Sequence, residues 1–510
     1  MAYSAHVGSF NINTALTATQ TQAITGVGFQ PKVVLFWWSG TTDTGDGVRG
    51  GNIQNGFGAM SGASSRIAAM GGAVDASAAC DSCAALYNTA CIVEMSITDF
   101  QLVGAADFSS LDADGFTLVI DDQFPSALRI SYLALGGTDL TDVYIGTKAM
   151  PTSTGNYSTT GVGFQPDALI TAFATTTANG AAGSAAFSVG MATGSGNQGV
   201  AAGYMHNDFA TMLAKGYGYG GEVNASVAFS TVNHRDAFVS FDADGFTLNH
   251  LESTTAWTFG FVALKGGQYK VCSVTTATDA NTFSDTEAGF QPAALLLLSA
   301  NRAQSTQDTL SANWAMSIGA ATSTSNRAAQ AVWNEDGLAD SETASGNYDS
   351  ACYANVKDDG VIGLMDISSI DATGVTFVMD DADPSACWVT YLAIGAAAAS
   401  GEDVTPAGIP STTAVANPTL TATATATPAS IASTTAVANL SLEVLTGTIE
   451  VAGIASTSAI ANPDLSIGAT NITLTGIAST TAIANPDLTA ETAYVLTAIQ
   501  VDNYVHLSWV

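Results

Sequence analysis

The chain contains three copies of one long unit, and this repetition constrains the fold more than any other feature. Each copy carries a Phe-Gln-Pro element followed by an apolar run, and the Phe stands at positions 29, 164 and 290. A later turn recurs in the same order, at Asp112–Phe116, Asp242–Phe246 and Asp371–Val375. Because two separate elements keep nearly the same spacing, a whole unit of about 130 residues is triplicated.

The local patterns within a unit predict β-structure. Proline cannot donate to a central ladder, so Phe-Gln-Pro is expected to end a strand. The apolar run that follows, Val33–Trp38 in the first copy, has the length of a buried central strand. Asp-x-Asp-Gly is a turn signal, and it leads into the alternating strand Phe116–Ile120. These patterns predict an all-β chain with three tandem β-sandwich or jelly-roll-like domains, each with its own core, at 1–139, 140–268 and 269–397.

A different and shorter repeat fills the C-terminal part of the chain. Residues 398–407 are expected to be a linker. Beyond it, isoleucines recur at 22- and 23-residue spacings, at Ile409, Ile431, Ile454 and Ile477. The alternation of side chains in each copy has the period of a strand, and Asn-Pro is expected to end that strand. We therefore expect 408–510 to be a 23-residue β-repeat domain with two short strands per copy, arranged as an Ig-like sandwich or a solenoid.

The charge balance excludes two classes of partner. The 510 residues include 12 Lys+Arg against 44 Asp+Glu, a formal net charge of -32. Without a basic surface, neither nucleic acid nor an anionic membrane is an expected partner. The N-terminal residues Met1–His6 lack the basic and apolar regions of a secretory signal, so we expect synthesis in a cytoplasm without signal-directed export.

The cysteines and the acidic turns each admit two interpretations. Cys80-x-x-Cys83 suggests zinc or redox chemistry, but neither a second pair nor a nearby His completes a site, so buried structural cysteines are favoured. Cys91 and Cys352 stand in matching places, as small buried residues would. The Asp-x-Asp-Gly turns resemble the start of a calcium loop, but the third copy has Thr373 in place of the second carboxylate, which favours turn chemistry over a metal site.

Enzymatic chemistry finds little support in the residue pattern. The adjacent pairs Asp121-Asp122 and Asp380-Asp381 are more typical of solvated strand ends than of glycosidase carboxylates. Five histidines, at 6, 206, 234, 250 and 506, do not recur between copies and belong to no catalytic motif. We therefore predict that the protein is not an enzyme, and we assign no catalytic, cofactor-binding or metal residues and no cofactor.

Tryptophans offer one alternative with a ligand. Trp37, Trp38, Trp314, Trp333 and Trp388 lie in or near apolar strand patterns, where tryptophan usually belongs to the core. If they were exposed at the ends of the sandwiches, they would be able to stack on sugars. Sugar binding therefore remains a second hypothesis.

Two motifs resemble those of phage proteins. The tandem Ile-Ala-Ser-x-x-Ala-x-Ala-Asn-Pro-x-Leu copies, clearest at Ile454–Leu465 and Ile477–Leu488, resemble repeats of structural proteins in tailed bacteriophages. The unit with Gly-Val-Gly-Phe-Gln-Pro near its start and Tyr-Leu-Ala-Leu-Gly at its end is similar to β-domains of phage fibre and decoration proteins. The two resemblances cover about 100 and about 390 residues.

The resemblance implies a non-enzymatic structural protein of the virion exterior, made in the host cytoplasm. Head decoration or a head fibre is the preferred role, and three copies in one chain would suit a pseudo-threefold platform. The alternatives are a tail fibre and an adhesin that binds host surface glycans for attachment; a glycan hydrolase has little support. The implied partners are other capsid or tail proteins, further copies of the chain in a trimer, and host glycans.

Overall fold

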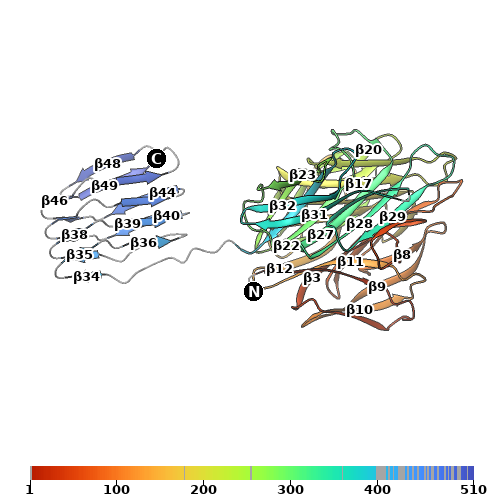
Figure 1. The fold of residues 1–510 in the computed structure, drawn as a ribbon, viewed down its shortest axis with the longest axis horizontal. Helices are drawn as coiled ribbons and strands as arrows, with labels where there is room; N and C mark the ends of the chain where they lie inside the picture. Colours follow the sequence, from red (N-terminus) through yellow and green to blue (C-terminus); the bar gives the residue numbers. More distant parts are fainter. Residues whose placement is uncertain are drawn as a thin grey trace. The chain divides into compact units, whose positions relative to one another are not determined.

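The computed structural model describes residues 3–397 except 177–178, 253–254 and 359, and beyond 397 it describes only the strand backbones. The described residues contain many strands and no helix, which confirms the predicted all-β fold (Figure 1). Among them, therefore, no helix is long and apolar enough to cross a membrane. The chain divides into two compact parts, Met1–Ala397 and Ala398–Val510, which we call the body and the C-terminal repeat domain.

The body consists of three units with one topology. The first unit (3–139) contains β1 (Ser4–Asn11), β2 (Thr21–Thr25), β3 (Pro31–Trp38), β4 (Gly47–Gly50), β5 (Ile53–Gly62), β6 (Ser65–Ala73), β7 (Ser82–Tyr87), β8 (Ile92–Ser96), β9 (Gln101–Asp112), β10 (Gly115–Asp122) and β11 (Arg129–Gly136). The second unit (140–267) contains β12 (Asp142–Ala149), β13 (Gly155–Thr160), β14 (Ala168–Ala174), β15 (Gly180–Gly183), β16 (Ala185–Gly194), β17 (Asn197–Met205), β18 (Ala214–Tyr219), β19 (Asn224–Val227), β20 (Val232–Asp242), β21 (Gly245–Glu252) and β22 (Thr258–Lys265). The third unit (268–397) contains β23 (Gln268–Thr275), β24 (Thr282–Asp285), β25 (Ala294–Ser299), β26 (Ser311–Ala312), β27 (Trp314–Ser323), β28 (Asn326–Asn334), β29 (Thr343–Tyr348), β30 (Tyr353–Lys357), β31 (Gly360–Asp371), β32 (Gly374–Asp381) and β33 (Trp388–Gly395).

Each unit is a sandwich of a seven-stranded and a four-stranded antiparallel sheet. The first unit contributes β1-β11-β3-β5-β6-β7 to its large sheet and forms its small sheet from β2-β10-β9-β8. The second and third units repeat these two orders strand for strand. Three sandwiches were predicted from the sequence, and the repeated strand order shows that the triplication extends to the whole topology.

The seventh strand of every large sheet comes from another unit. Strand β15 of the second unit pairs with β7 of the first, and β26 of the third unit pairs with β18 of the second. Strand β4 of the first unit pairs with β29 of the third, which closes the circle. Along the sequence, each donated strand stands between the third strand of its own unit and the long strand that follows. The exchange therefore links three sandwiches into one ring of sheets, and each edge that it covers is no longer open to pairing with other chains.

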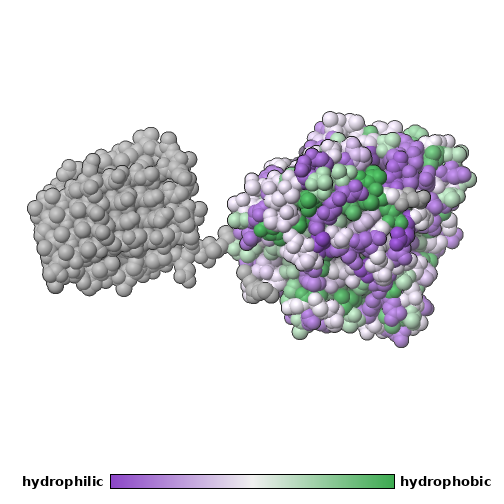
Figure 2. All heavy atoms as spheres, in the orientation of Figure 1, coloured by the Kyte–Doolittle hydropathy of each residue, from purple (hydrophilic) through white to green (hydrophobic). Residues whose placement is uncertain are grey.

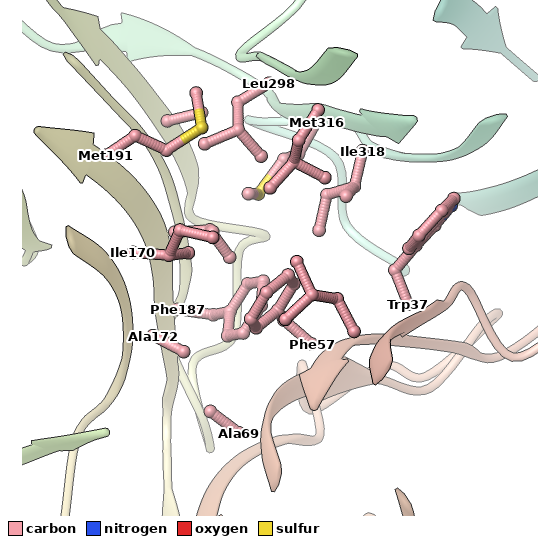
Figure 3. Packing of buried hydrophobic residues seen from close by; sticks show 14 of the residues in the cluster. Trp37, Phe57, Ala69, Ile170, Ala172, Phe187, Met191, Leu298, Met316 and Ile318 are labelled. Atoms are coloured by element: carbon pink, nitrogen blue, oxygen red, sulfur yellow. The ribbon is translucent and has the colours of Figure 1, made fainter. Parts of the chain in front are cut away.

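A shared apolar core lies where the three large sheets meet. Phe57, Phe187 and Met316, from β5, β16 and β27, are fully buried and belong to one hydrophobic cluster. Figure 3 shows these side chains from three units converging. Each unit also has apolar residues between its own two sheets. Since full burial of one large apolar side chain contributes roughly 1.5–3 kcal/mol, the shared core stabilises all three units together.

The C-terminal repeat domain contains parallel strands stacked in register, as in a solenoid (Figure 1). The prediction of two strands per copy was wrong: three ladders run through the copies, because the strands are only two to four residues long and each copy has room for three. The ladders are β34 (Ile409–Ser411), β37 (Ile431–Ser433), β41 (Ala455–Ser456) and β45 (Ala478–Ser479); β35 (Ala414–Ala416), β38 (Ala436–Ala438), β42 (Ala459–Ile460) and β46 (Ala482–Ile483); and β36 (Thr419–Ala422), β39 (Ser441–Val444), β43 (Asp464–Ile467) and β47 (Asp487–Ala490). Strands β40 (Gly447–Ala452), β44 (Thr470–Thr475), β48 (Leu496–Val501) and β49 (Tyr504–Trp509) complete the domain. The predicted linker, 398–407, lies outside the described residues.

Candidate functional site

The junctions between units repeat one hydrogen bond in circular order. The Val7 amide on β1 donates to Asn326 Oδ1 of the third unit at 2.7 Å. The corresponding amides of the second and third units donate to the hairpin of the preceding unit, Ile145 to Ser65 Oγ at 3.1 Å and Val271 to Thr193 Oγ1 at 3.0 Å. The same strand thus meets the same hairpin at all three junctions, so the body is pseudo-threefold in its contacts as well as in its topology.

Ion pairs at two junctions differ from this common pattern. Arg129 of the first unit pairs with Asp349 of the third, and Lys215 of the second unit pairs with Asp336 of the third. The Asp336 carboxylate also accepts the backbone N–H of Ala214 at 3.0 Å. These partly buried charges are specific to individual junctions, whereas the backbone contacts above are common to all of them.

The Asp-x-Asp-Gly turns and the Phe-Gln-Pro elements form one clamp. Asp114 accepts the amides of Gly26 and Gly28 at 3.3 and 2.6 Å, and the Gln30 side chain donates to the Leu111 carbonyl at 2.7 Å. Asp244 in the second unit accepts the matching amides at 2.9 and 2.6 Å, and these bonds lower the pKa of its carboxyl. Because the carboxylate oxygens already accept these hydrogen bonds, the contacts support turn chemistry.

The third unit keeps the clamp without the second carboxylate. There the amide of Gly289 donates to the backbone carbonyl of Thr373 at 2.9 Å. The first Asp is retained in all three turns and accepts two hydroxyl groups, as Asp112 does from Ser110 and Thr117 at 2.7 Å each. Thr373 is therefore tolerated in place of the second Asp, because a backbone hydrogen bond replaces the side-chain hydrogen bonds.

The six cysteines are free and buried. Cys80 and Cys83 belong to different hydrophobic clusters, on the two sides of the large sheet of the first unit, so the Cys-x-x-Cys pair does not converge on one site. Cys91 and Cys352 are equivalent, since their Sγ atoms each donate at 3.3 Å, to the carbonyls of Ala106 and Met365. Burial raises the pKa of the Cys83 thiol to about 12, as expected of an inert structural cysteine.

The tryptophans singled out by sequence are core residues. Trp37, Trp38, Trp314, Trp333 and Trp388 are all buried. Sugar stacking on them would require opening the sandwiches. The adjacent acids Asp121-Asp122 and Asp380-Asp381 are exposed at the ends of β10 and β32, where successive side chains point to opposite faces.

An exposed aromatic cluster lies on the second unit. Phe209 and Phe229 are 36% and 48% exposed, and their ring centroids are 5.5 Å apart. His206 completes the cluster, with its ring 5.1 Å from that of Phe209. On the face of the body that Figure 2 shows, hydrophilic and hydrophobic residues are intermixed. Among the residues that the structure describes, these two are the only exposed large aromatic side chains. No local sequence signal distinguishes them from the phenylalanines of the core.

Two histidines that are distant in sequence meet inside the second unit. His234 on β20 and His250 on β21 have ring centroids 4.5 Å apart, and Asp236 lies beside them. All three residues are fully buried. The histidines look scattered in the sequence because the pairing of β20 with β21, which brings them together, is not visible in their linear spacing.

No known protein family matches the chain, and no curated protein matches it either.

Proposed function

We propose that the protein is a non-enzymatic structural component of the exterior of a bacteriophage particle, in head decoration or in a head fibre. The observation that carries this proposal is the circular exchange of β4, β15 and β26 between the three units. A ring built from one chain presents three related faces without needing three chains. Such a body suits attachment to a capsid surface at a position of threefold or near-threefold symmetry.

The construction also suits the demands on an exposed particle protein. Each donated strand covers one edge of a neighbouring large sheet, and covered edges resist unwanted pairing between chains. The formal net charge of -32 favours solubility and opposes non-specific association. The expected partners are capsid or tail proteins, and the expected location is the virion.

Localisation on purified particles tests this proposal. Gold-labelled antibody and cryo-electron microscopy, applied to particles from the source lysate, should place the protein on the capsid exterior. Density at the tail tip would move the assignment to a tail fibre. Absence of the protein from every particle would refute the virion assignment.

The exposed aromatic cluster favours a second candidate, an adhesin for host surface glycans. Aromatic faces stack on sugar rings, and Phe209 and Phe229 are available for this in the second unit. A glycan array probed with the wild type and with Phe229→Ala tests the idea. Binding by the wild type that is lost in Phe229→Ala supports an adhesin. The control is Phe100→Ala, which changes a partly buried phenylalanine of the first unit and should keep binding. A blank array for the wild type contradicts the adhesin hypothesis.

A further inference from the structure

The interior of the second sandwich contains a compact group of polar side chains. Asp236 and His250 are paired directly across β20 and β21, and His234 lies two residues before Asp236, on the same face of β20. His250 Nδ1 is 2.6 Å from Asp236 Oδ1. One potential ligand atom from each of the three residues lies within 4.8 Å of the other two.

Several atoms of this group have no hydrogen-bond partner within the described part of the chain. They are both ring nitrogens of His234, Nε2 of His250, and Oδ1 of the neighbouring Asn224. The amide nitrogen of Asn224 donates to Asp236 Oδ2 at 3.2 Å, so the aspartate is held from two sides. Buried imidazole nitrogens are normally hydrogen-bonded or bound to a metal ion.

The equivalent positions of the sister units show that the fold does not need these polar residues. In the first unit, Ala106 pairs with Ile120 where Asp236 pairs with His250. In the third unit, Met365 pairs with Met379 at the same place. The sandwich thus closes with an apolar pair in two units and with a His–Asp pair only in the second.

The position of His234 differs in the same way. Its equivalents are Gly104 and Gly363, which lie opposite Glu94 and Asn355 as His234 lies opposite Ser226. The space above Gly104 is filled by Phe124, and that above Gly363 by Asp383. In the third unit the polar group is satisfied, because Asp383 accepts from Asn355 at 2.9 Å and from Tyr353 at 3.2 Å. Among the described residues, unpartnered imidazole nitrogens at this place in the sandwich are therefore found in the second unit alone.

We propose that His234, His250 and Asp236 bind a divalent transition-metal ion of the zinc class. Imidazole nitrogens and carboxylate oxygens are ligand types that bind Zn²⁺ in proteins. An aspartate that also contacts a ring nitrogen orients the histidine and offsets the charge of the ion. Since all three residues are buried, the ion is structural and joins β20 to β21 within the small sheet.

Aromatic side chains surround the ring of His234. His234 stacks on Phe173, with ring centroids 5.9 Å apart, and also lies 5.4 Å from Trp257. These ring contacts fix the orientation of the His234 imidazole inside the sandwich.

The test uses the full-length protein, stripped with a chelator and then titrated with Zn²⁺ or with Co²⁺ as a spectroscopic probe. The proposal predicts about one tightly bound ion per chain, visible-light absorption of bound Co²⁺ typical of a tetrahedral site, and a rise in melting temperature with added Zn²⁺. His234→Phe and Asp236→Asn should each lose the bound ion and the rise in melting temperature. His206→Ala, which changes a surface histidine, is the matched control and should keep both.

Two results would overturn the proposal. The first is wild-type protein that binds no Zn²⁺ after stripping and whose melting temperature does not respond to the ion; this result does not depend on any variant folding. The second is Zn²⁺ that remains bound in His234→Phe but is lost in His206→Ala, since that would place the ion on the surface.

Discussion

The second sandwich and its two sister sandwiches have the same strand order but different interiors. Ala106–Ile120 and Met365–Met379 are apolar pairs, whereas Asp236–His250 is a charged and polar pair in the same register. The second unit also carries the exposed aromatic rings of Phe209 and Phe229. The ring of three units therefore requires only the common topology and the shared apolar core. The individual units are free to acquire separate roles.

The largest expected effect concerns what the three units share. Phe187→Ala removes a fully buried ring from the shared apolar core, and such truncations typically cost about 3–5 kcal/mol in the free energy of unfolding. We expect a loss of this size in the free energy of unfolding, measured by denaturant titration. Phe209→Ala, at an exposed position of the same unit, should change it by less than about 0.5 kcal/mol. Equal effects of the two substitutions would contradict a shared core.

The second prediction concerns the pH dependence that is specific to the second unit. The pKa of His234 is lowered by burial to about 4 from an ordinary 6.5, with Asp236 and His250 as the nearby titratable groups. The folded protein therefore binds fewer protons than the unfolded chain between these values, and the stability contributed by His234 is present above pH 6.5 and lost as the pH falls through about 4. In metal-free protein, this loss should be on the order of 3 kcal/mol at most.

The difference between wild type and His234→Phe isolates this effect, because Phe does not titrate. The subtraction is needed since Glu222 acts in the opposite direction: burial raises its pKa to about 7, so its contribution is present below about 4.5 and lost as the pH rises through 7. Melting curves between pH 4 and pH 8 provide the measurement. Parallel pH profiles of the two proteins would show that His234 is not held neutral by the fold.

The third prediction separates a junction from the surface. Asp336→Ala removes the partner of Lys215 and the acceptor for the amide of Ala214 across a junction. We expect a cost of about 1–3 kcal/mol, since a partly buried donor loses its acceptor. Asp43→Ala breaks the ion pair with Arg49, in which both side chains are nearly half exposed, and should cost less than about 1 kcal/mol. Thermal unfolding of both variants measures the contrast, and a larger loss in Asp43→Ala would argue against the junction.

The smallest expected effect concerns the clamp. Asp114→Ala removes the exposed acceptor for the amides of Gly26 and Gly28, and we expect a loss of at most about 1 kcal/mol. Thr373→Ala should have almost no effect, because its backbone carbonyl accepts the equivalent bond in the third unit. Hydrogen exchange at the glycine amides reports both cases. Unchanged exchange at Gly28 in Asp114→Ala would exclude the clamp.

The sequence was sufficient to predict the all-β fold because Phe-Gln-Pro, Asp-x-Asp-Gly and the alternating strands are local signals repeated three times. It did not show the donated strands, since β4, β15 and β26 have only two to four residues and carry no distinctive pattern. The contact between His234 and His250 was also hidden, because a register between neighbouring strands is needed to bring residues 16 positions apart together. The stacking of three strands per repeat was missed for the same reason, as strands of two residues fall below the length at which alternation is visible.

The most direct test of the account is hydrogen exchange of the full-length protein in increasing denaturant, resolved by peptides from β5, β16 and β27. These strands are equivalent in the three units and carry the shared core. If the donated strands and the shared apolar core make the body one cooperative structure, all three peptides should lose protection at the same denaturant concentration. Loss of protection in separate steps, one unit after another, would contradict the closed ring.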